Sequence, residues 1–250
     1  MPSGSLPSSL PSLSSPVLSN CGLDEFPLFL SHANLSLSLV NLDLRGNKLE
    51  GSIPQALLNM TSLMYLYLVG NDLSFDVPIL NELKKLYHLE TLDLSYNRFQ
   101  GKVGDFENSL SPSIGYSLKT LNLRFNNFSG HLPNWLYPLK NLEILDLSLN
   151  SFDGPIPTSF GASPRLKELD LSYNRLSGQI LASFGRLSNL ARLHLRNNRL
   201  SGQISASFRS LSNLTGLDLR NNLLTVVVSE VHLAKVSKLK ILDLSKNSLS

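Results

Sequence analysis

The sequence predicts an α/β solenoid, a right-handed superhelix of about ten repeats with a parallel β-sheet on its concave face. Two observations predict it. A pattern of 24 to 29 residues recurs along most of the 250-residue chain, and leucines stand at alternate positions inside each copy. One copy is too small to bury its own leucines, so neighbouring copies must stack and share a core. We therefore expect one quasi-linear array and not one or two compact domains.

Residues 142–157, LEILDLSLNSFDGPIP, give the repeat most clearly. If Asn150 is position n, leucines stand at n−8, n−5 and n−3, an apolar residue at n+2, glycine at n+4 and Ile-Pro at n+6 and n+7. The L-x-L alternation predicts a short strand with its leucines on the inner face. This is the signature of leucine-rich repeats. Glycine at n+4 indicates a special backbone angle or a close approach.

The polar residue at position n forms a predicted ladder along the array. An asparagine amide has donors and an acceptor, so it can satisfy backbone groups of the turn that would otherwise be buried unpaired. Cys21, the only cysteine, occupies the first slot and excludes an internal disulfide. We expect it to be a small buried residue, with a reactive thiol as the alternative. The ladder consists of Cys21, Asn47, Asn71, Asn97, Asn126, Asn150, Asn174, Asn198, Asn222 and Asn247.

The predicted boundaries are a Ser/Pro-rich disordered tail at residues 1–12 and a solenoid at residues 13–250 without polar caps at either end. The longest interval, between Asn97 and Asn126, places an outer loop at residues 104–117. The N-terminal residues lack the apolar region of a signal peptide, and no run has the length of a membrane span. We expect a fragment whose targeting and membrane segments lie outside this chain.

Composition and motifs favour binding over catalysis. The net charge of +3 is scattered along the chain, which argues against nucleic acid. Aspartates recur at n−4, but they belong to the repeated LDLS unit, whose serines can hydrogen-bond them. The histidines lack metal-ligand spacing, and phosphate loops and nucleophile motifs are missing. We expect no catalytic residues, no metal site, no cofactor and no enzymatic activity. The n−4 aspartates form a column along the array and are Asp43, Asp93, Asp146, Asp170, Asp218 and Asp243.

Departures from the repeat average on the strand face indicate a binding surface. Four consecutive copies have Tyr96, Phe125, Leu149 and Tyr173 at n−1, an exposed stripe of the kind that anchors partners. The residues Tyr65 and Tyr67 extend it toward the first end.

Two arginines stand at n−2 in adjacent copies near the other end. Arg196 and Arg220 replace the usual serine, with His194 beside them, and they can grip a carboxylate or an acidic peptide. The alternative is that these side chains cover strand ends or pair with Asp218 and its neighbours.

Four Asn-x-Ser/Thr sequons would be glycosylation sites in a secreted protein. They begin at Asn34, Asn59, Asn127 and Asn213. A glycan at Asn127 would shield one rim of the stripe at Phe125.

The Gly-x-Ile-Pro half of the repeat resembles the plant-specific class of leucine-rich repeats. Residues 19–30, 117–133, 150–161 and 222–249 resemble more closely the ectodomains of plant receptor-like proteins, in particular those similar to the ethylene-inducing-xylanase receptors. The resemblance implies a plasma-membrane protein with its repeats outside the cell. It also implies a pathogen, protein, peptide or glycan ligand, and defence or developmental signalling through a partner co-receptor kinase.

Two alternatives remain open. One is a soluble wall-protein inhibitor resembling the polygalacturonase-inhibiting proteins, which would need cap cysteines at both ends. The other is a non-functional truncated copy whose uncapped ends expose core leucines and a sheet edge.

Overall fold

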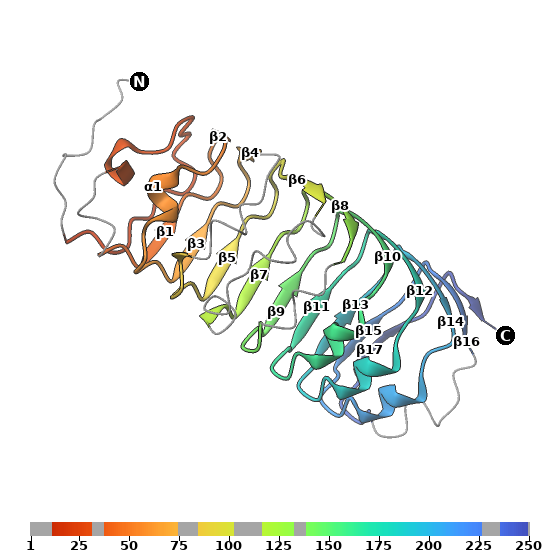
Figure 1. Cartoon of the computed structure of the whole chain (residues 1–250). Helices are drawn as coiled ribbons and strands as arrows, with labels where there is room; N and C mark the ends of the chain where they lie inside the picture. The colour runs from red at the N-terminus through yellow and green to blue at the C-terminus, as the bar shows by residue number, and fades with distance from the viewer. Residues whose placement is uncertain are drawn as a thin grey trace.

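The computed structural model of the chain describes residues 12–31, 38–74, 85–102, 117–132, 139–226 and 236–249. Over these ranges the chain winds into an elongated array of stacked coils, with the first and last described coils at opposite ends (Figure 1). Residues one repeat apart in the sequence are therefore neighbours in space. Most of the predicted tail, residues 1–11, and most of the predicted outer loop, residues 104–116, lie outside the described residues.

One parallel sheet, the main sheet, runs along the array and confirms the predicted concave sheet. Its nine strands follow one another in space in chain order. The leucine at n−5 of one coil lies opposite the same leucine of the next, as Leu42 does with Leu66 and Leu66 with Leu92. The strands are β1 (Asn41–Asp43), β3 (Tyr65–Tyr67), β5 (Thr91–Asp93), β7 (Thr120–Asn122), β9 (Ile144–Asp146), β11 (Glu168–Asp170), β13 (Arg192–His194), β15 (Gly216–Asp218) and β17 (Ile241–Asp243).

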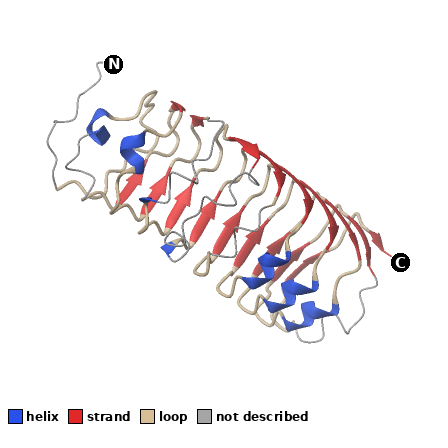
Figure 2. Ribbon diagram, in the orientation of Figure 1, coloured by secondary structure: helices blue, strands red, loops and turns tan. Residues whose placement is uncertain are grey.

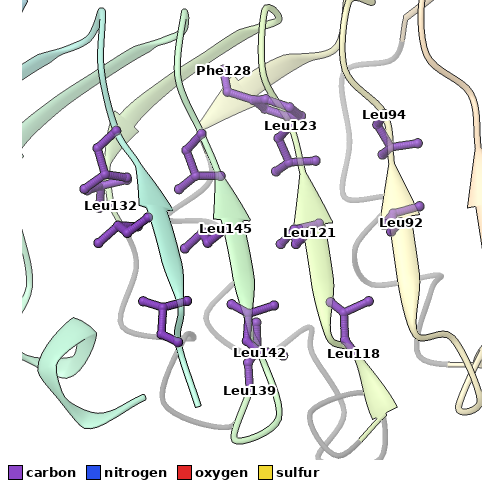
Figure 3. Close-up of a cluster of buried hydrophobic side chains, with 14 of the residues drawn as sticks. Leu92, Leu94, Leu118, Leu121, Leu123, Phe128, Leu132, Leu139, Leu142 and Leu145 are labelled. Carbon is purple, nitrogen blue, oxygen red and sulfur yellow. The ribbon is translucent and has the colours of Figure 1, made fainter. Parts of the chain in front are cut away.

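The leucines that were predicted to point inward form the core, and side chains of successive coils stack in rows (Figure 3). Leu121 and Leu123, at n−5 and n−3, are at most 1% exposed. The position n+2 adds phenylalanines, and the ring of Phe128 lies 6.4 Å from those of both Phe99 and Phe152. Burying one such side chain contributes about 1.5–3 kcal/mol. The core is therefore continuous from coil to coil.

Each ladder asparagine bridges two coils, which confirms and extends its predicted role. The Nδ2 of Asn71 donates to the carbonyl oxygens of Leu68 in its own coil and Leu44 in the preceding coil, both at 3.0 Å. Its Oδ1 accepts from the N–H of Leu49 at 3.1 Å. The same three bonds recur in the other ladder asparagines, for example at Asn198. Aspartate has no donor and leucine bonds nothing, so only asparagine satisfies all three groups.

Cys21 corrects one prediction: it is exposed and not buried. The Cys21 N–H donates to Oδ1 of Asn47 in the next coil at 3.0 Å. Cys21 therefore occupies the predicted position n of the first coil. Within the described residues, however, no earlier coil stacks on this side of the cysteine. Burial at position n comes from the preceding coil and not from the residue type.

A second parallel sheet, which was not predicted, follows the turn in the coils from Asn97 to Asn247. It contains seven strands in sequential order, and a separate two-stranded sheet pairs β2 (Glu50–Gly51) with β4 (Asp72–Leu73). The n+4 glycines have the predicted special angle, with φ of 69° at Gly154. A Cβ there would lie 2.8 Å from Nδ1 of His131. The strands are β6 (Gln100–Lys102), β8 (Asn127–His131), β10 (Ser151–Pro155), β12 (Arg175–Gln179), β14 (Arg199–Gly202), β16 (Leu223–Val226) and β18 (Ser248–Leu249).

Short helices occur on the return path of several coils (Figure 2). Buried phenylalanines anchor three of them: Phe160, Phe184 and Phe208 are each at most 1% exposed. The helices therefore close the core on the side where the chain returns to the next strand. They are η1 (Leu28–Ser31), α1 (Gln55–Leu58), η6 (Thr158–Ala162), η7 (Ala182–Arg186) and η8 (Ala206–Ser210).

Candidate functional site

The candidate site is the outward face of the main sheet. In a typical strand such as β5 the central leucine is buried, while the flanking residues Thr91 and Asp93 face outward. Position n−2 continues this face, and n−1 begins the turn that leads to the ladder asparagine. A surface of repeated columns results, in which one position of every coil lies beside the same position of the next.

Position n−1 has a left-handed backbone in all ten coils, with φ between 52° and 65°. Glycine and asparagine adopt this conformation readily, whereas other residues are destabilised by about 1–2 kcal/mol. Five coils carry glycine or asparagine here. The four central coils carry large apolar side chains, a choice that the backbone itself disfavours. The ten residues are Asn20, Gly46, Gly70, Tyr96, Phe125, Leu149, Tyr173, Asn197, Asn221 and Lys246.

The residues Tyr96, Phe125, Leu149 and Tyr173 form what we term the aromatic row. The predicted exposure of its aromatic members is confirmed, at 44% for Tyr96, 51% for Phe125 and 41% for Tyr173, and Leu149 is half-buried. Tyr96 and Phe125 stack with their centroids 4.9 Å apart and their planes at 17°. The row therefore presents ring faces and an aliphatic side chain to solvent over four adjacent coils.

Tyr65 and Tyr67 are half-buried outward residues of β3. The Tyr67 ring lies 5.0 Å from Cζ of Arg45, and the Tyr65 hydroxyl lies 3.3 Å from Oε2 of Glu90. Both tyrosines are therefore already engaged by side chains of the array. They belong to the same concave face as the aromatic row, at the coils nearer the N-terminus.

The n−4 aspartates differ along the array. Asp43 receives two bonds from Arg45, from Nε at 2.9 Å and from Nη2 at 2.6 Å. In the middle, Asp146 is bonded through one oxygen by the N–H and hydroxyl of Ser148, at 2.9 and 2.6 Å. Asp170 is held in the same way by Ser172. The predicted serine–aspartate pairing is therefore confirmed, and the arginine partner is added only in some coils.

These surroundings shift the aspartate pKa values in opposite directions. The hydrogen bond from the Arg45 side chain lowers the pKa of Asp43 below its usual value. Burial raises the pKa of Asp146, and the neighbouring Asp170 carboxylate raises it further, against the bonds from Ser148 and the charge of Arg124. The ionised form of Asp146 is therefore less stabilised by its surroundings than the ionised form of Asp43.

Arg124, at n−2 in the central coils, joins the aromatic row to the carboxylates. Its Nε donates to the Tyr96 hydroxyl at 3.2 Å, and its Cζ lies 5.8 Å from that ring's centroid. Its Nη1 donates to Oγ of Ser148 at 2.7 Å, and Ser148 in turn bonds Asp146. Contacts between coils determine the role of Arg124, so the spacing of the repeat did not reveal it.

Arg196 and Arg220 do not form a free anion-binding pair. Arg196 lies 3.4 Å from Asp218, and Arg220 lies 3.7 Å from Asp218 and 3.4 Å from Asp243. This is the alternative arrangement, in which the arginines pair with Asp218 and its neighbour. Arg196 also stands over the Tyr173 ring, with its Cζ 5.2 Å from the centroid. His194 is a half-buried outward residue of β13, beside these pairs.

The sequon asparagines have different surroundings. Asn59 is exposed and accepts from Lys85 at 3.3 Å, while Nδ2 of Asn213 donates to the Ser188 carbonyl at 2.8 Å. Asn34 lies outside the described residues. Asn127 belongs to β8 of the second sheet and lines a shallow hollow of about 500 Å³ there, not the main sheet's face. The lining residues are Gln100, Gly101, Asn127, Ser129, Ser151 and Arg175.

In the part of the chain that the structure describes, no three His, Cys, Asp or Glu residues gather as a metal site would require. Over the same residues, no helix has the length and apolarity needed to cross a membrane. The concave face carries ring faces, carboxylates and guanidinium groups, which are suited to non-covalent recognition.

Comparisons with known proteins identify the repeat. Two family models, both described as leucine-rich repeat, match residues 116–176 and 188–249, and residues 38–60 and 88–112. They cover more than half of the chain. Receptor-like protein CLAVATA2 of Arabidopsis thaliana is 42% identical over 74 residues, 30% of this chain and 10% of its own length. Receptor like protein 27 of Arabidopsis thaliana is 38% identical over 85 residues, 34% of this chain and 10% of its own length.

A similar solved structure is the Arabidopsis receptor kinase HAESA in complex with the peptide hormone IDA and the co-receptor SERK1. It aligns with a TM-score of 0.80 and 32% identity, over 98% of this chain and 40% of that chain. This chain thus spans about a tenth of the curated relatives' length and less than half of the HAESA chain. With the stacked coils and the asparagine ladder, these matches show that the chain belongs to the leucine-rich-repeat family and that it is similar to plant receptor-like proteins.

Proposed function

We propose that this chain is the recognition part of a plant cell-surface receptor-like protein, and that it binds a peptide or protein ligand at the aromatic row. The observation that carries the proposal is the combination of strain and exposure in that row. Four consecutive coils place Tyr, Phe or Leu where five others have glycine or asparagine. Exposed aromatic side chains and strained backbone are each unfavourable for stability, and together they favour a role in binding.

The relatives support a peptide ligand and a partner protein. The HAESA structure contains a peptide hormone and a co-receptor, and another similar structure is titled as a complex of PEPR1 with AtPEP1. Large aromatic side chains on a rigid sheet are the usual anchors of such interfaces. By extension, we propose that a co-receptor kinase assembles with this receptor when its ligand is bound.

The same relatives support a proposal for the cellular setting. Two curated matches are receptor-like proteins, so we place the parent protein at the plasma membrane with these coils on the extracellular side. In that setting Asn34, Asn59, Asn127 and Asn213 are glycosylation sites. Defence or developmental signalling is the process we propose for it.

Selection with a displayed random dodecapeptide library tests the proposal. The library is selected on the immobilised wild-type protein, and a synthetic peptide from the enriched pool is titrated by calorimetry against the Phe125→Ser/Tyr173→Ser variant. We expect an affinity loss of about 30-fold or more, because two anchoring side chains of this kind together contribute at least ~2 kcal/mol. Circular dichroism should report an unchanged fold.

The matched control is Tyr87→Ser. Tyr87 is 46% exposed, as the row tyrosines are, but it lies outside the main sheet. We expect no change in affinity from this control. Equal affinities for the row variant and the wild type would remove the aromatic row as the binding surface.

A further inference from the structure

The carboxylates beside the aromatic row have no paired cation. Asp146 and Asp170 lie opposite each other in the register of β9 and β11, so their strands are about 4.8 Å apart. One oxygen of each is bonded by its own serine, Ser148 or Ser172. Among the described residues, no lysine or arginine forms an ion pair with either carboxylate.

Arginines neutralise the aspartates at the two ends of the column, whereas Asp93 accepts from the Ser95 N–H and the Asn122 amide. Asp43 is paired with Arg45, and Asp218 and Asp243 are paired with Arg196 and Arg220. Arg124 is the cation whose charge acts on Asp146; it bonds Ser148 and lies against Tyr96. Two carboxylates and one guanidinium leave a net negative charge in the middle of the concave face, next to Phe125, Leu149 and Tyr173.

Three tyrosines of this face already lie against guanidinium groups. Arg45 stands over Tyr67, Arg124 over Tyr96 and Arg196 over Tyr173, at 5.0, 5.8 and 5.2 Å from Cζ to the ring centroid. Ring faces carry negative partial charge, so they attract cations. Phe125 is stacked on Tyr96 and is the most exposed aromatic of the row at 51%, so its surface is open to a ligand.

We infer that the occupant of this face is a peptide with a basic side chain. Its guanidinium or ammonium group lies between Asp146 and Asp170, and an adjacent apolar residue packs on Phe125, Leu149 and Tyr173. The inference rests on the proposed function and gives it a ligand class. The apolar row supplies the contact area, and the unpaired carboxylates determine the sign of the charge that fits. An acidic peptide would be repelled by Asp146 and Asp170. The arginines that could attract it, Arg196 and Arg220, are already paired with aspartates.

The raised pKa of Asp146 predicts a second measurable effect, the release of protons on binding. The groups that face Asp146 are Asp170 on β11, Arg124 following β7 and its own Ser148. A ligand cation favours the ionised form of Asp146, so binding near that pKa releases protons. The measured binding enthalpy should then vary with the ionisation enthalpy of the buffer.

The test uses peptides from the dodecapeptide selection described above, on the full chain. We expect the enriched sequences to contain arginine or lysine next to an apolar residue. The tightest synthetic peptide should bind the Asp146→Asn/Asp170→Asn variant about 30-fold or more weakly, because each ligand charge–carboxylate contact is lost. Replacing its basic residue by glutamine should produce a similar loss on the wild type and little further loss on the variant.

The control is Asp153→Asn, which changes a half-buried carboxylate on the second sheet. This variant should bind the peptide with the affinity of the wild type. Asparagine keeps the acceptor oxygen for Ser148 and Ser172, and circular dichroism checks that the variant folds. Peptides that need the aromatic row but are neutral or acidic would overturn this inference and leave the proposed function standing. If the selection enriches no row-dependent peptide, both fail.

Discussion

The central coils and the flanking coils share one scaffold but present different surfaces on it. At n−1 the flanking coils carry Gly46, Gly70, Asn197 and Asn221, which suit the left-handed backbone. The central coils carry the aromatic row at the same backbone angle. At n−4 the flanking aspartates Asp43, Asp218 and Asp243 have arginine partners, whereas Asp146 and Asp170 have only serines.

The difference separates residues that stabilise the array from residues that are available to a ligand. Local preference, charge pairing and solvent exposure agree in the flanking coils, as expected where stability alone matters. In the central coils, apolar residues occupy the left-handed position over four consecutive repeats, three of them are exposed aromatics, and Asp146 and Asp170 have no paired cation. Such clustered violations are typical of functional surfaces.

The largest expected effect concerns the shared scaffold. We expect Asn150→Ala in the centre and Asn222→Ala in the flank each to lower the free energy of unfolding by about 3 kcal/mol. Each change leaves two carbonyl oxygens and one N–H without their partner. Denaturant titration followed by circular dichroism measures both. A large difference between the two would show that the central coils differ in scaffold as well as surface.

Neutralising an n−4 aspartate should have a smaller effect on stability, and the effect should differ between the flanking and the central coils. At neutral pH we expect Asp43→Asn to lower the free energy of unfolding by about 1 kcal/mol, because it breaks a charged hydrogen bond to the half-exposed Arg45. Asp146→Asn should leave stability unchanged or raise it, because burial and Asp170 already disfavour that anion. Thermal unfolding of both variants at pH 7 tests this. A clear loss from Asp146→Asn would contradict it.

The pH dependence of stability should separate the same two residues. The pKa of Asp146 is raised in the folded state, so its anion destabilises the fold above that pKa, and the penalty disappears as pH falls toward the ordinary value of 3.8. The pKa of Asp43 is lowered, so its contribution is present above 3.8 and is lost as pH falls through the folded value. The free energy of unfolding is measured between pH 3 and about 7 for the wild type and both variants. As pH falls, the wild type should become more stable relative to Asp146→Asn. Over the same range it should lose its stability advantage over Asp43→Asn. Parallel curves would be the contrary result.

The last expected effect on stability concerns the backbone at n−1. Gly70→Leu gives a flanking coil the central type of residue, and we expect about 1 kcal/mol of lost stability. A Cβ at Gly70 would meet its nearest neighbour at 3.8 Å, so the loss reflects the left-handed φ and not a clash. Denaturant titration measures it. Stability equal to that of the wild type would mean that the backbone does not disfavour the aromatic row.

The repeat spacing predicted the features that recur in every coil. The main sheet, the buried leucines and the ladder asparagines follow from the residue type at a fixed position, and all are present. The second sheet was missed because its strands consist largely of serine, glycine and charged residues, as in residues 175–179, which resemble a loop. Its pairing comes from the stacking of coils and not from local preference.

The surface was predictable only in part. The exposure of Tyr96, Phe125 and Tyr173 followed from their position, but the left-handed angle that orients them did not. The pairing of Arg196 and Arg220 with aspartates, and the absence of such pairing at Asp146, depend on contacts between side chains of different coils. Cys21 was misplaced because burial of its slot requires an earlier coil.

The most direct measurement uses the Phe125→Asn/Tyr173→Asn variant, which gives the central coils the residue of Asn197 and Asn221. The affinity for a row-dependent selected peptide and the free energy of unfolding are measured on the same samples. We predict an affinity loss of about 30-fold or more with stability equal to or above that of the wild type, because asparagine relieves the backbone while removing the anchors. Undiminished affinity, or a loss of affinity that follows a loss of stability, would contradict a recognition surface in the central coils.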